Sequence, residues 1–357
     1  MTARPDISVI IPLYNAGPFI DRTLRCLVDS QFASMSADSW EIIVVNDGST
    51  DNGPETVSRY AGSHPGQIRL IDIPNSGVSV ARNTGIDHSR GRYIYFMDAD
   101  DLIHPGALSE LIRLADESGA DILRFGHTEI SSDEIPATGT EPLMAGDLPH
   151  PDVMTSRDFL DRSMGMIRSQ GLWAVWGALF RASFIRDYQL RFRPGLIVGE
   201  DCVFMWQALL TTSTVAVIDT RLYYYIKNLS GAIHSRNLTH KRRMMEGRRL
   251  LSDILIGILR DRGDDMTEQA RNGLIIAARN AHNESLIDAI TVGEPLRSVG
   301  RMMRHYQASG MTVKPGRPRF YMPGEHHPAS TRIRRWIAAY PIAIEIALSG
   351  FIRRNRQ

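Results

Sequence analysis

Polar residues that could do chemistry follow short apolar runs in the first hundred positions. Asn15 follows ISVII, Asp47 follows WEIIVV, and the acids Asp98, Asp100 and Asp101 follow YIYFM. Carboxylates at this spacing suit Mg²⁺ or Mn²⁺, which commonly bind through one or two carboxylates plus substrate phosphates. Because adjacent acids repel one another, the cluster needs a cation, hydrogen-bond donors or water. It indicates a metal and phosphate site; for Asp101 alone, a solvated turn or a helix cap is the alternative.

The elements that must position these residues alternate between strands and helices. The apolar runs Ile7–Ile11, Ile42–Val45, Ile68–Ile73 and Tyr93–Met97 have the length of buried strands, and Phe19–Val28 and Val78–His88 have helical patterns. This alternation predicts βαβ units and a mostly parallel sheet. Ligands bind outside the carboxyl ends of the strands in such a sheet, so the polar residues should meet at one edge. We expect Asp51 to cap the second helix.

Composition and motifs exclude several classes of protein. The 357 residues are 43% hydrophobic and 23% charged, which is typical of a globular chain of two or three domains. The net charge of +1 argues against a general nucleic-acid binder, and two cysteines exclude a disulfide scaffold. Neither a G-x-G-x-x-G fingerprint nor a P-loop is present. The start of the chain lacks a signal-peptide pattern, so we expect a cytoplasmic protein.

Four motifs together carry a family resemblance. In order, they are SVIIPLYNAG, VVNDGSTD, NSGVSVARNTGI and YIYFMDADDLIHP. They resemble the nucleotide-binding half of glycosyltransferase family 2, specifically over about residues 5–115 and more weakly to about 235. The resemblance implies an α/β GT-A fold, with a mostly parallel Rossmann-like sheet flanked by helices. It also implies inverting transfer of a sugar from a nucleotide-diphosphate donor.

The resemblance assigns donor-site roles position by position. Tyr14 lies beside the nucleobase in a pocket that Pro12 shapes, and Asp47 accepts a hydrogen bond from the base, most simply uracil. Asp98 faces the ribose and the metal, and Asp100 coordinates the Mn²⁺ or Mg²⁺ that bridges the diphosphate.

Asn15, Ala99 and Arg82 complete the expected donor site, and Asn83 belongs to the same A-R-N motif. For Arg82 the alternative is an ion pair with a structural acid, and for Tyr14 it is an aromatic at the edge of the core.

The pair Glu200-Asp201 resembles the family's catalytic pair, since Asp201 lies about a hundred residues beyond Asp100. Inverting transfer needs a carboxylate opposite the leaving group to take the proton of the acceptor hydroxyl. The resemblance makes Asp201 that general base and gives Glu200 a hydrogen bond to the acceptor or to a backbone amide. Without the resemblance, the pair would indicate the start of a helix.

Three more residues are expected at the acceptor and metal sites. Trp173 and Trp176 resemble the family's aromatic stretch before the base and would shape the acceptor site; a core helix is the alternative. His234 is a candidate ligand of the metal or the diphosphate, with a structural histidine as the alternative.

The sequence divides into three parts. We expect a nucleotide-sugar half at 1–130, an acceptor and base half at 131–238 that opens with a long loop at 131–155, and a helical extension at 239–357. From residue 311 onward nine Lys and Arg face two acids. This basic charge and the apolar residues of 331–357 predict attachment to an anionic membrane surface, peripheral on the inner face of the cell membrane. A core helix or a homodimer helix is the alternative.

The predicted function is transfer of a sugar from a nucleotide-diphosphate sugar to a hydroxyl of a glycan or lipid-linked glycan in polysaccharide biosynthesis. The simplest expectation for the donor is a UDP-sugar. Because no apolar run of eighteen residues occurs, multi-span processive synthases are excluded. The alternative is a catalytically idle module that binds glycans or nucleotide sugars.

Overall fold

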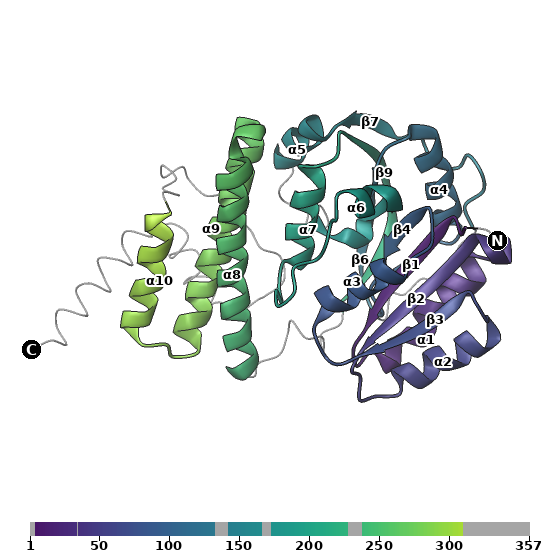
Figure 1. Cartoon of the computed structure of the whole chain (residues 1–357), viewed down its shortest axis with the longest axis horizontal. Coiled ribbons are helices and arrows are strands. Elements are labelled where there is room, and N and C mark those ends of the chain that lie inside the picture. The colour runs from purple at the N-terminus through teal and green to yellow at the C-terminus, as the bar shows by residue number, and fades with distance from the viewer. Residues whose placement is uncertain (1–3, 34, 133–141, 166–172, 228–237, 310–357) are drawn as a thin grey trace, which may run out of the picture. The chain divides into compact units, whose positions relative to one another are not determined.

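A computed structural model describes residues 4–33, 35–132, 142–165, 173–227 and 238–309. The chain forms two compact units, Met1–Gly231 and Ala232–Gln357. The first is an α/β unit and the second, where described, is helical (Figure 1). Most of the two expected parts 1–130 and 131–238 thus lies within one unit.

A single nine-stranded sheet forms the centre of the first unit. Its strands are β1 (Ile7–Leu13), β2 (Trp40–Asp47), β3 (Ile68–Ile73), β4 (Tyr93–Phe96), β5 (Leu102–Ile103), β6 (Ile122–Ser131), β7 (Asp152–Thr155), β8 (Ala178–Arg181) and β9 (Thr214–Lys227). The order is β3-β2-β1-β4-β8-β6-β9-β5, and β7 pairs with β9. The pairs β1–β2, β2–β3 and β1–β4 are parallel, which confirms the predicted parallel arrangement for these four strands; the sheet as a whole is mixed. Strand β8 runs antiparallel to β4 and β6.

Helices cover both faces of the sheet (Figure 1). The helices of this unit are α1 (Gly17–Arg25), α2 (Gly53–Ser63), α3 (Val78–His88), α4 (Ala107–Ser118), α5 (Ser156–Gly165), α6 (Ala182–Asp187) and α7 (Glu200–Leu209). A π-helical turn, Cys26–Gln31, continues α1, and 3₁₀ turns occupy Ala37–Ser39 and Val175–Gly177. With both faces covered, β1 and β2 are buried along nearly all of their length, and their central residues 9–11 and 42–45 form apolar runs.

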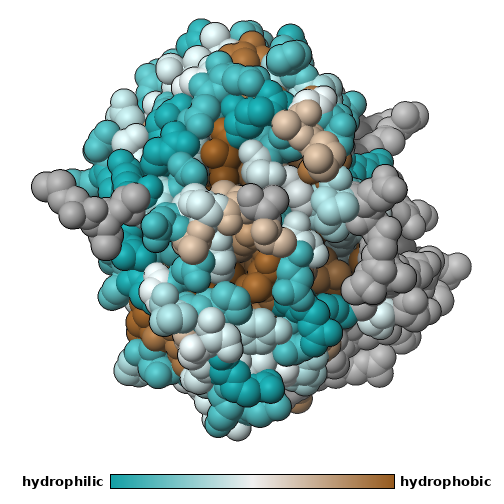
Figure 2. Space-filling model, turned by 90° about the vertical axis from the view of Figure 1, so that its right-hand side faces the viewer, coloured by the Kyte–Doolittle hydropathy of each residue, from teal (hydrophilic) through white to brown (hydrophobic). Residues whose placement is uncertain are grey.

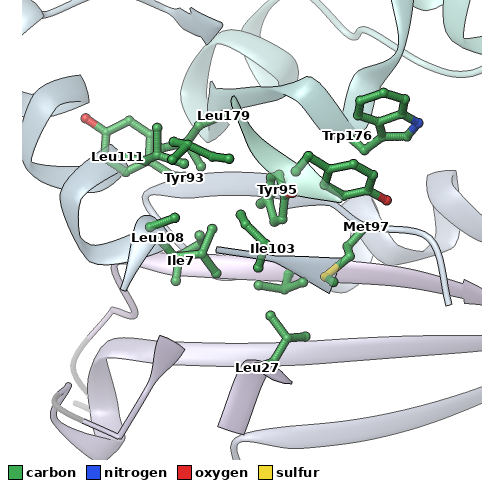
Figure 3. Packing of buried hydrophobic residues seen from close by; sticks show 14 of the residues in the cluster. Ile7, Leu27, Tyr93, Tyr95, Met97, Ile103, Leu108, Leu111, Trp176 and Leu179 are labelled. Carbon is green, nitrogen blue, oxygen red and sulfur yellow. The ribbon is translucent and has the colours of Figure 1, made fainter. Parts of the chain in front are cut away.

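Alternate side chains of the central strands belong to two different layers. Ile7, Val9 and Ile11 of β1 pack in the main core cluster, which also holds residues of α1, α2 and α4. Figure 3 shows part of this cluster. On the opposite face, Gly85 of α3 lies so close to Ile10 that a Cβ would not fit. In the view of Figure 2 the surface is mostly hydrophilic around a smaller hydrophobic area.

Two local expectations are corrected by the structure. Asn52, and not Asp51, is the N-cap residue of α2. The Asp51 carboxylate instead accepts hydrogen bonds from the first amides of two helices, Gly17 of α1 at 2.6 Å and Gly53 of α2 at 3.0 Å. The expected loop at 131–155 ends in strand β7, because Asp152–Thr155 finds a free edge of β9 to pair with.

The second unit, over its described residues, contains α8 (Leu238–Arg262), a 3₁₀ turn (Gly263–Asp265), α9 (Glu268–Thr291) and α10 (Leu296–Ala308). This confirms the predicted helical extension. Leu286, Ala289 and Val299 pack together between α9 and α10, and Arg248 of α8 pairs with Asp288 of α9. No helix in the described ranges has the length and hydropathy needed to cross a bilayer. The basic tail at 331–357 lies outside these ranges.

Asp101 joins the segment after β4 to strand β9. Its carboxylate, only 1% exposed, accepts hydrogen bonds from the Tyr223 hydroxyl at 2.6 Å and the Ile226 amide at 2.8 Å. Burial, with the nearby charges of Asp98 and Asp100, raises the pKa of Asp101 well above its ordinary value. The alternative of a solvated turn at Asp101 is therefore wrong: the residue is buried and links the segment after β4 to β9.

We expect Tyr223→Phe to lower the free energy of unfolding by about 1–3 kcal/mol, because a buried carboxylate loses a donor without replacement. Urea unfolding measures the loss. The control is Tyr188→Phe, at a ring 59% exposed, which should change the free energy by less than about 0.5 kcal/mol. Equal losses in the two variants would contradict the role of the Asp101 link.

Candidate active site

The loops after β1, β2 and β3 meet at the carboxyl edge of the sheet, as predicted. Asn15, with a left-handed φ of 49°, accepts a hydrogen bond from the Thr50 amide at 2.8 Å. Asp47 is 4% exposed and accepts hydrogen bonds from the Ser76 and Gly77 amides at 2.6 and 2.8 Å. Each carboxylate oxygen of Asp47 keeps a second lone pair for a ligand.

Tyr14 stands out from this edge, with its side chain 54% exposed. The position excludes the alternative of an aromatic buried at the edge of the core. Pro12 lies near the end of β1 and is half-buried. An exposed phenol ring above a fixed loop offers a flat face on which a planar ligand can stack.

One guanidinium connects the predicted site acids. Arg82, in α3, is 3% exposed. Its Nη1 donates to Asp201 Oδ1 at 2.6 Å and to Glu200 Oε1 at 3.1 Å, and its Nη2 donates to Asp98 Oδ1 at 2.9 Å. The ring of Phe192 lies 5.2 Å from the guanidinium carbon. Arg82 therefore forms ion pairs, as the alternative for this residue predicted. The acids that it binds are those of the candidate site.

Asp201 is held on both carboxylate oxygens. Oδ1 receives the Arg82 bond, and Oδ2 accepts a hydrogen bond from the Val175 amide at 3.2 Å. The pKa of Asp201 is raised to about 7, mainly by burial. The negative charges of Glu200 and Asp98 raise the pKa further, and the positive charge of Arg82 lowers it. A carboxylate with a pKa near neutrality can accept a proton at the pH of the cell.

Gly199 sets where Asp201 points. Its φ of 75° is left-handed, and it is the N-cap residue of α7, so Glu200 and Asp201 occupy the first turn of that helix. The positive end of the helix dipole favours negative charge there. The pair thus begins a helix, as predicted without the resemblance, and also lies among the site residues.

The fit of a divalent metal depends on Asp98 and Asp100. Asp98 keeps 30% of its side chain exposed, and only its Oδ1 faces Arg82. Ala99, which lies between them, is buried, and its carbonyl oxygen accepts a hydrogen bond from the Thr23 hydroxyl at 2.9 Å. The described residues contain no cluster of three or more acids, histidines or cysteines that could hold a metal alone. Two carboxylates fit an ion that is bound jointly with a diphosphate.

The two tryptophans predicted at the acceptor site differ in their surroundings. Trp176 is 8% exposed and belongs to the main core cluster (Figure 3). Its ring stacks on that of Tyr223, with 4.4 Å between the ring centroids. Trp173 is half-buried and stacks on Trp206 at 4.9 Å. The core alternative holds for Trp176, so the structure gives it no exposed ring face for an acceptor. His234 lies outside the described residues. Asn83 exchanges hydrogen bonds with the backbone of Phe192.

Arg124 was missed by sequence reasoning. It lies in β6, is 4% exposed, and its positive charge interacts with Asp201. The available signal was a charged residue inside the apolar strand pattern ILRF, a position where arginine is rare unless a partner is present.

Comparisons with known proteins identify the family. Residues 8–173 match Glycosyl transferase family 2. The glycosyltransferase YibD of Escherichia coli, itself uncharacterized, is 31% identical over 270 residues, which span 71% of this chain and 72% of YibD. The chain belongs to glycosyltransferase family 2. Further relatives match over 60–63% of their own length, so the chain spans less than two thirds of them.

Solved structures agree with this fold. TarS 1–349 of Staphylococcus aureus, in complex with UDP-GlcNAc, has a TM-score of 0.53 at 19% identity over 86% of this chain and 88% of that one. The mannosyltransferase PcManGT of Pyrobaculum calidifontis, in complex with GDP-Man and Mn²⁺, has a TM-score of 0.52 at 18% identity. The match covers 97% of this chain and 87% of PcManGT. The likeness confirms the GT-A fold that the motifs predicted.

We expect Arg82→Met to lower the free energy of unfolding by about 3–5 kcal/mol, because three converging carboxylates lose their shared cation. Urea unfolding at neutral pH measures the change. The control, Arg191→Met, breaks an exposed pair with Asp87 and should cost less than about 1 kcal/mol. A similar small loss at Arg82 would contradict the stabilising role of this guanidinium.

Proposed function

We propose that this protein is a metal-dependent inverting glycosyltransferase that uses a nucleotide-diphosphate sugar, most simply a UDP-sugar. The acceptor is a hydroxyl of a glycan or of a lipid-linked glycan, in polysaccharide biosynthesis. The single observation that carries the proposal is the Arg82 bridge. Asp201, with a pKa of about 7, and Asp98, the first of the acids that follow β4, bind the same guanidinium.

The proposed reaction assigns a role to each side of this bridge. Asp201 takes the proton from the acceptor hydroxyl, and the hydroxyl oxygen forms a bond to the anomeric carbon from the face opposite the diphosphate. The bond from the anomeric carbon to the diphosphate oxygen breaks, and the nucleoside diphosphate leaves with the electron pair. An α-linked donor therefore gives a β-linked product.

Donor binding is assigned to the carboxyl edge of the sheet. Tyr14 stacks on the base, Asp47 accepts a hydrogen bond from it, and Asn15 keeps the two adjacent loops in place. Asp98 and Asp100 would hold a divalent ion with the diphosphate; when bound, such an ion stabilises the charge of the leaving group. Support comes from Mn²⁺ in the PcManGT complex.

Support for a polymeric acceptor comes from relatives. TarS of Staphylococcus aureus, a poly(ribitol-phosphate) beta-N-acetylglucosaminyltransferase, is 24% identical over 224 residues, which span 63% of this chain and 36% of TarS. Its name describes transfer to a polymer with a β linkage. We retain attachment of 331–357 to an anionic membrane as a proposal, which would bring a lipid-linked acceptor to the site.

The donor is tested by thermal shift with UDP-, GDP- and dTDP-sugars in the presence of Mn²⁺. A bound donor at a hundred times its Kd adds about 2.7 kcal/mol of stability, which should raise Tm by several degrees. We expect Asp100→Asn to lose the part of this shift that depends on Mn²⁺, and Tyr14→Ala to reduce the shift without lowering the Tm of the free protein.

The control variant Asp87→Asn, at an exposed residue of α3, should keep the full shift. A panel in which no nucleotide sugar raises Tm would overturn the donor site. Donor binding with no release of nucleoside diphosphate, in both the parent and Asp201→Asn, would favour the catalytically idle binding module.

The proposed base gives a specific pH dependence. Because Asp201 must be ionised to accept a proton and its pKa is about 7, kcat/KM for donor hydrolysis should fall about tenfold per pH unit below pH 7. Above pH 7 it should level off. Asp201→Asn should lower the rate by about 10²–10⁴-fold and abolish this acidic limb. An unchanged limb in that variant would assign the proton acceptor to another residue.

A further inference from the structure

Arg124 is bound to the same peptide group as the proposed base. Its Nη1 donates to the Ala174 carbonyl oxygen at 2.8 Å. The amide of the next residue, Val175, donates to Asp201 Oδ2 at 3.2 Å. The carbonyl and the amide belong to one peptide unit, and in a trans peptide they point in opposite directions. The guanidinium and the carboxylate therefore lie on opposite sides of the Ala174–Val175 peptide.

The local backbone is built to bring Arg124 to this position. Pairing of β6 with β9 shifts register between Arg124 and Gly126, which is a bulge directly after the arginine. Bulges near active sites re-aim a side chain. On the other side, a Cβ added to Gly177 would lie 3.3 Å from the Phe125 carbonyl and 3.4 Å from Arg124 Nη2. The 3₁₀ turn Val175–Gly177 thus packs tightly against the guanidinium.

We propose that Arg124 is a positioning residue for the base: it fixes and polarises the Ala174–Val175 peptide, whose amide holds the Asp201 carboxylate in its reactive orientation. This inference rests on the proposed role of Asp201. Hydrogen bonds in a chain strengthen one another in a low-dielectric interior. A positive charge behind the carbonyl makes the amide a better donor to the ionised carboxylate, so this arrangement favours the charged form of Asp201.

Arg82 and Arg124 both favour the charged form of Asp201, whereas two neighbouring acids disfavour it. Arg82 from α3 contacts Oδ1 directly, while Glu200 in α7 and Asp98 at the end of β4 carry like charge. Burial lowers the pKa of Arg124 to about 10, and the charge of Asp201 opposes this, so Arg124 stays protonated at neutral pH. Its charge is therefore present throughout the range in which Asp201 titrates.

The experiment measures the titration of Asp201 in the full-length protein, free of metal and nucleotide. The probe is ¹³Cγ-labelled aspartate, with the Asp201 signal assigned by its loss in Asp201→Asn. We expect Arg124→Met to move the titration midpoint upward by about half a pH unit or more, since a positive charge and a polarised donor are both lost. Arg124→Gln, which keeps a donor for the carbonyl but loses the charge, should shift the midpoint in the same direction by less.

The matched control is Arg186→Met. Arg186, in α6, also donates to a backbone carbonyl, that of Ser89 at 2.8 Å, but the charges that act on its pKa come from residues other than Asp201. This variant should leave the midpoint unchanged. If Arg124→Met does not fold, as judged by circular dichroism, Arg124→Gln alone decides. If Asp201 titrates at the same midpoint in the folded Arg124 variants as in the parent protein, the proposal is overturned.

Kinetics separate this inference from the proposed function. With the donor that raises Tm most, we expect Arg124→Gln to lower kcat for hydrolysis about tenfold while KM for the donor stays within about twofold. The acidic limb should move upward with the midpoint. A shifted midpoint in a protein whose turnover does not depend on Asp201 would overturn the proposed function and leave the link between Arg124 and Asp201 in place.

Discussion

The candidate site depends on the burial of one positive charge among three negative ones. Arg82 reaches from α3 to Asp98 at the end of β4 and to Glu200 and Asp201 at the start of α7. Each carboxylate alone would be costly to bury, and together they would repel. The guanidinium suits this place because its terminal nitrogens are fixed in a plane and bind several oxygens at once. The pairs with Glu200 and Asp201 thus connect segments that are more than a hundred residues apart in the sequence.

This arrangement explains how one site can hold acids of different character. Asp98 keeps 30% of its side chain exposed, whereas Asp201 keeps 19%, and burial raises the pKa of Asp201 toward neutrality in spite of Arg82. Asp101 is buried more deeply still and links to β9. Groups fixed before a ligand arrives need little reorganisation during a reaction, which is the usual source of electrostatic stabilisation in enzymes.

Much of the fold could be predicted because its signals are local. The apolar runs of β1 to β4 and the periodic patterns of α1 and α3 were placed within a few residues, and their alternation was sufficient to predict the parallel part of the sheet. Predictions about single side chains were less secure. Trp176 entered the core through Tyr223, and strand β7 formed because β9 has an edge to pair with. Both outcomes depend on partners that are 47 and more residues away in the sequence.

The sequence by itself determined the family, the strand ends that carry polar residues, and the acids that meet there. The type and spacing of neighbouring residues are sufficient for such conclusions. Only the tertiary structure decided that Arg82 binds all three carboxylates, that Asp101 is a buried link, and that Arg124 stands behind the peptide that holds Asp201. The physical reason is that charge, burial and hydrogen bonding depend on which distant segments come together, and that is a property of the packed chain.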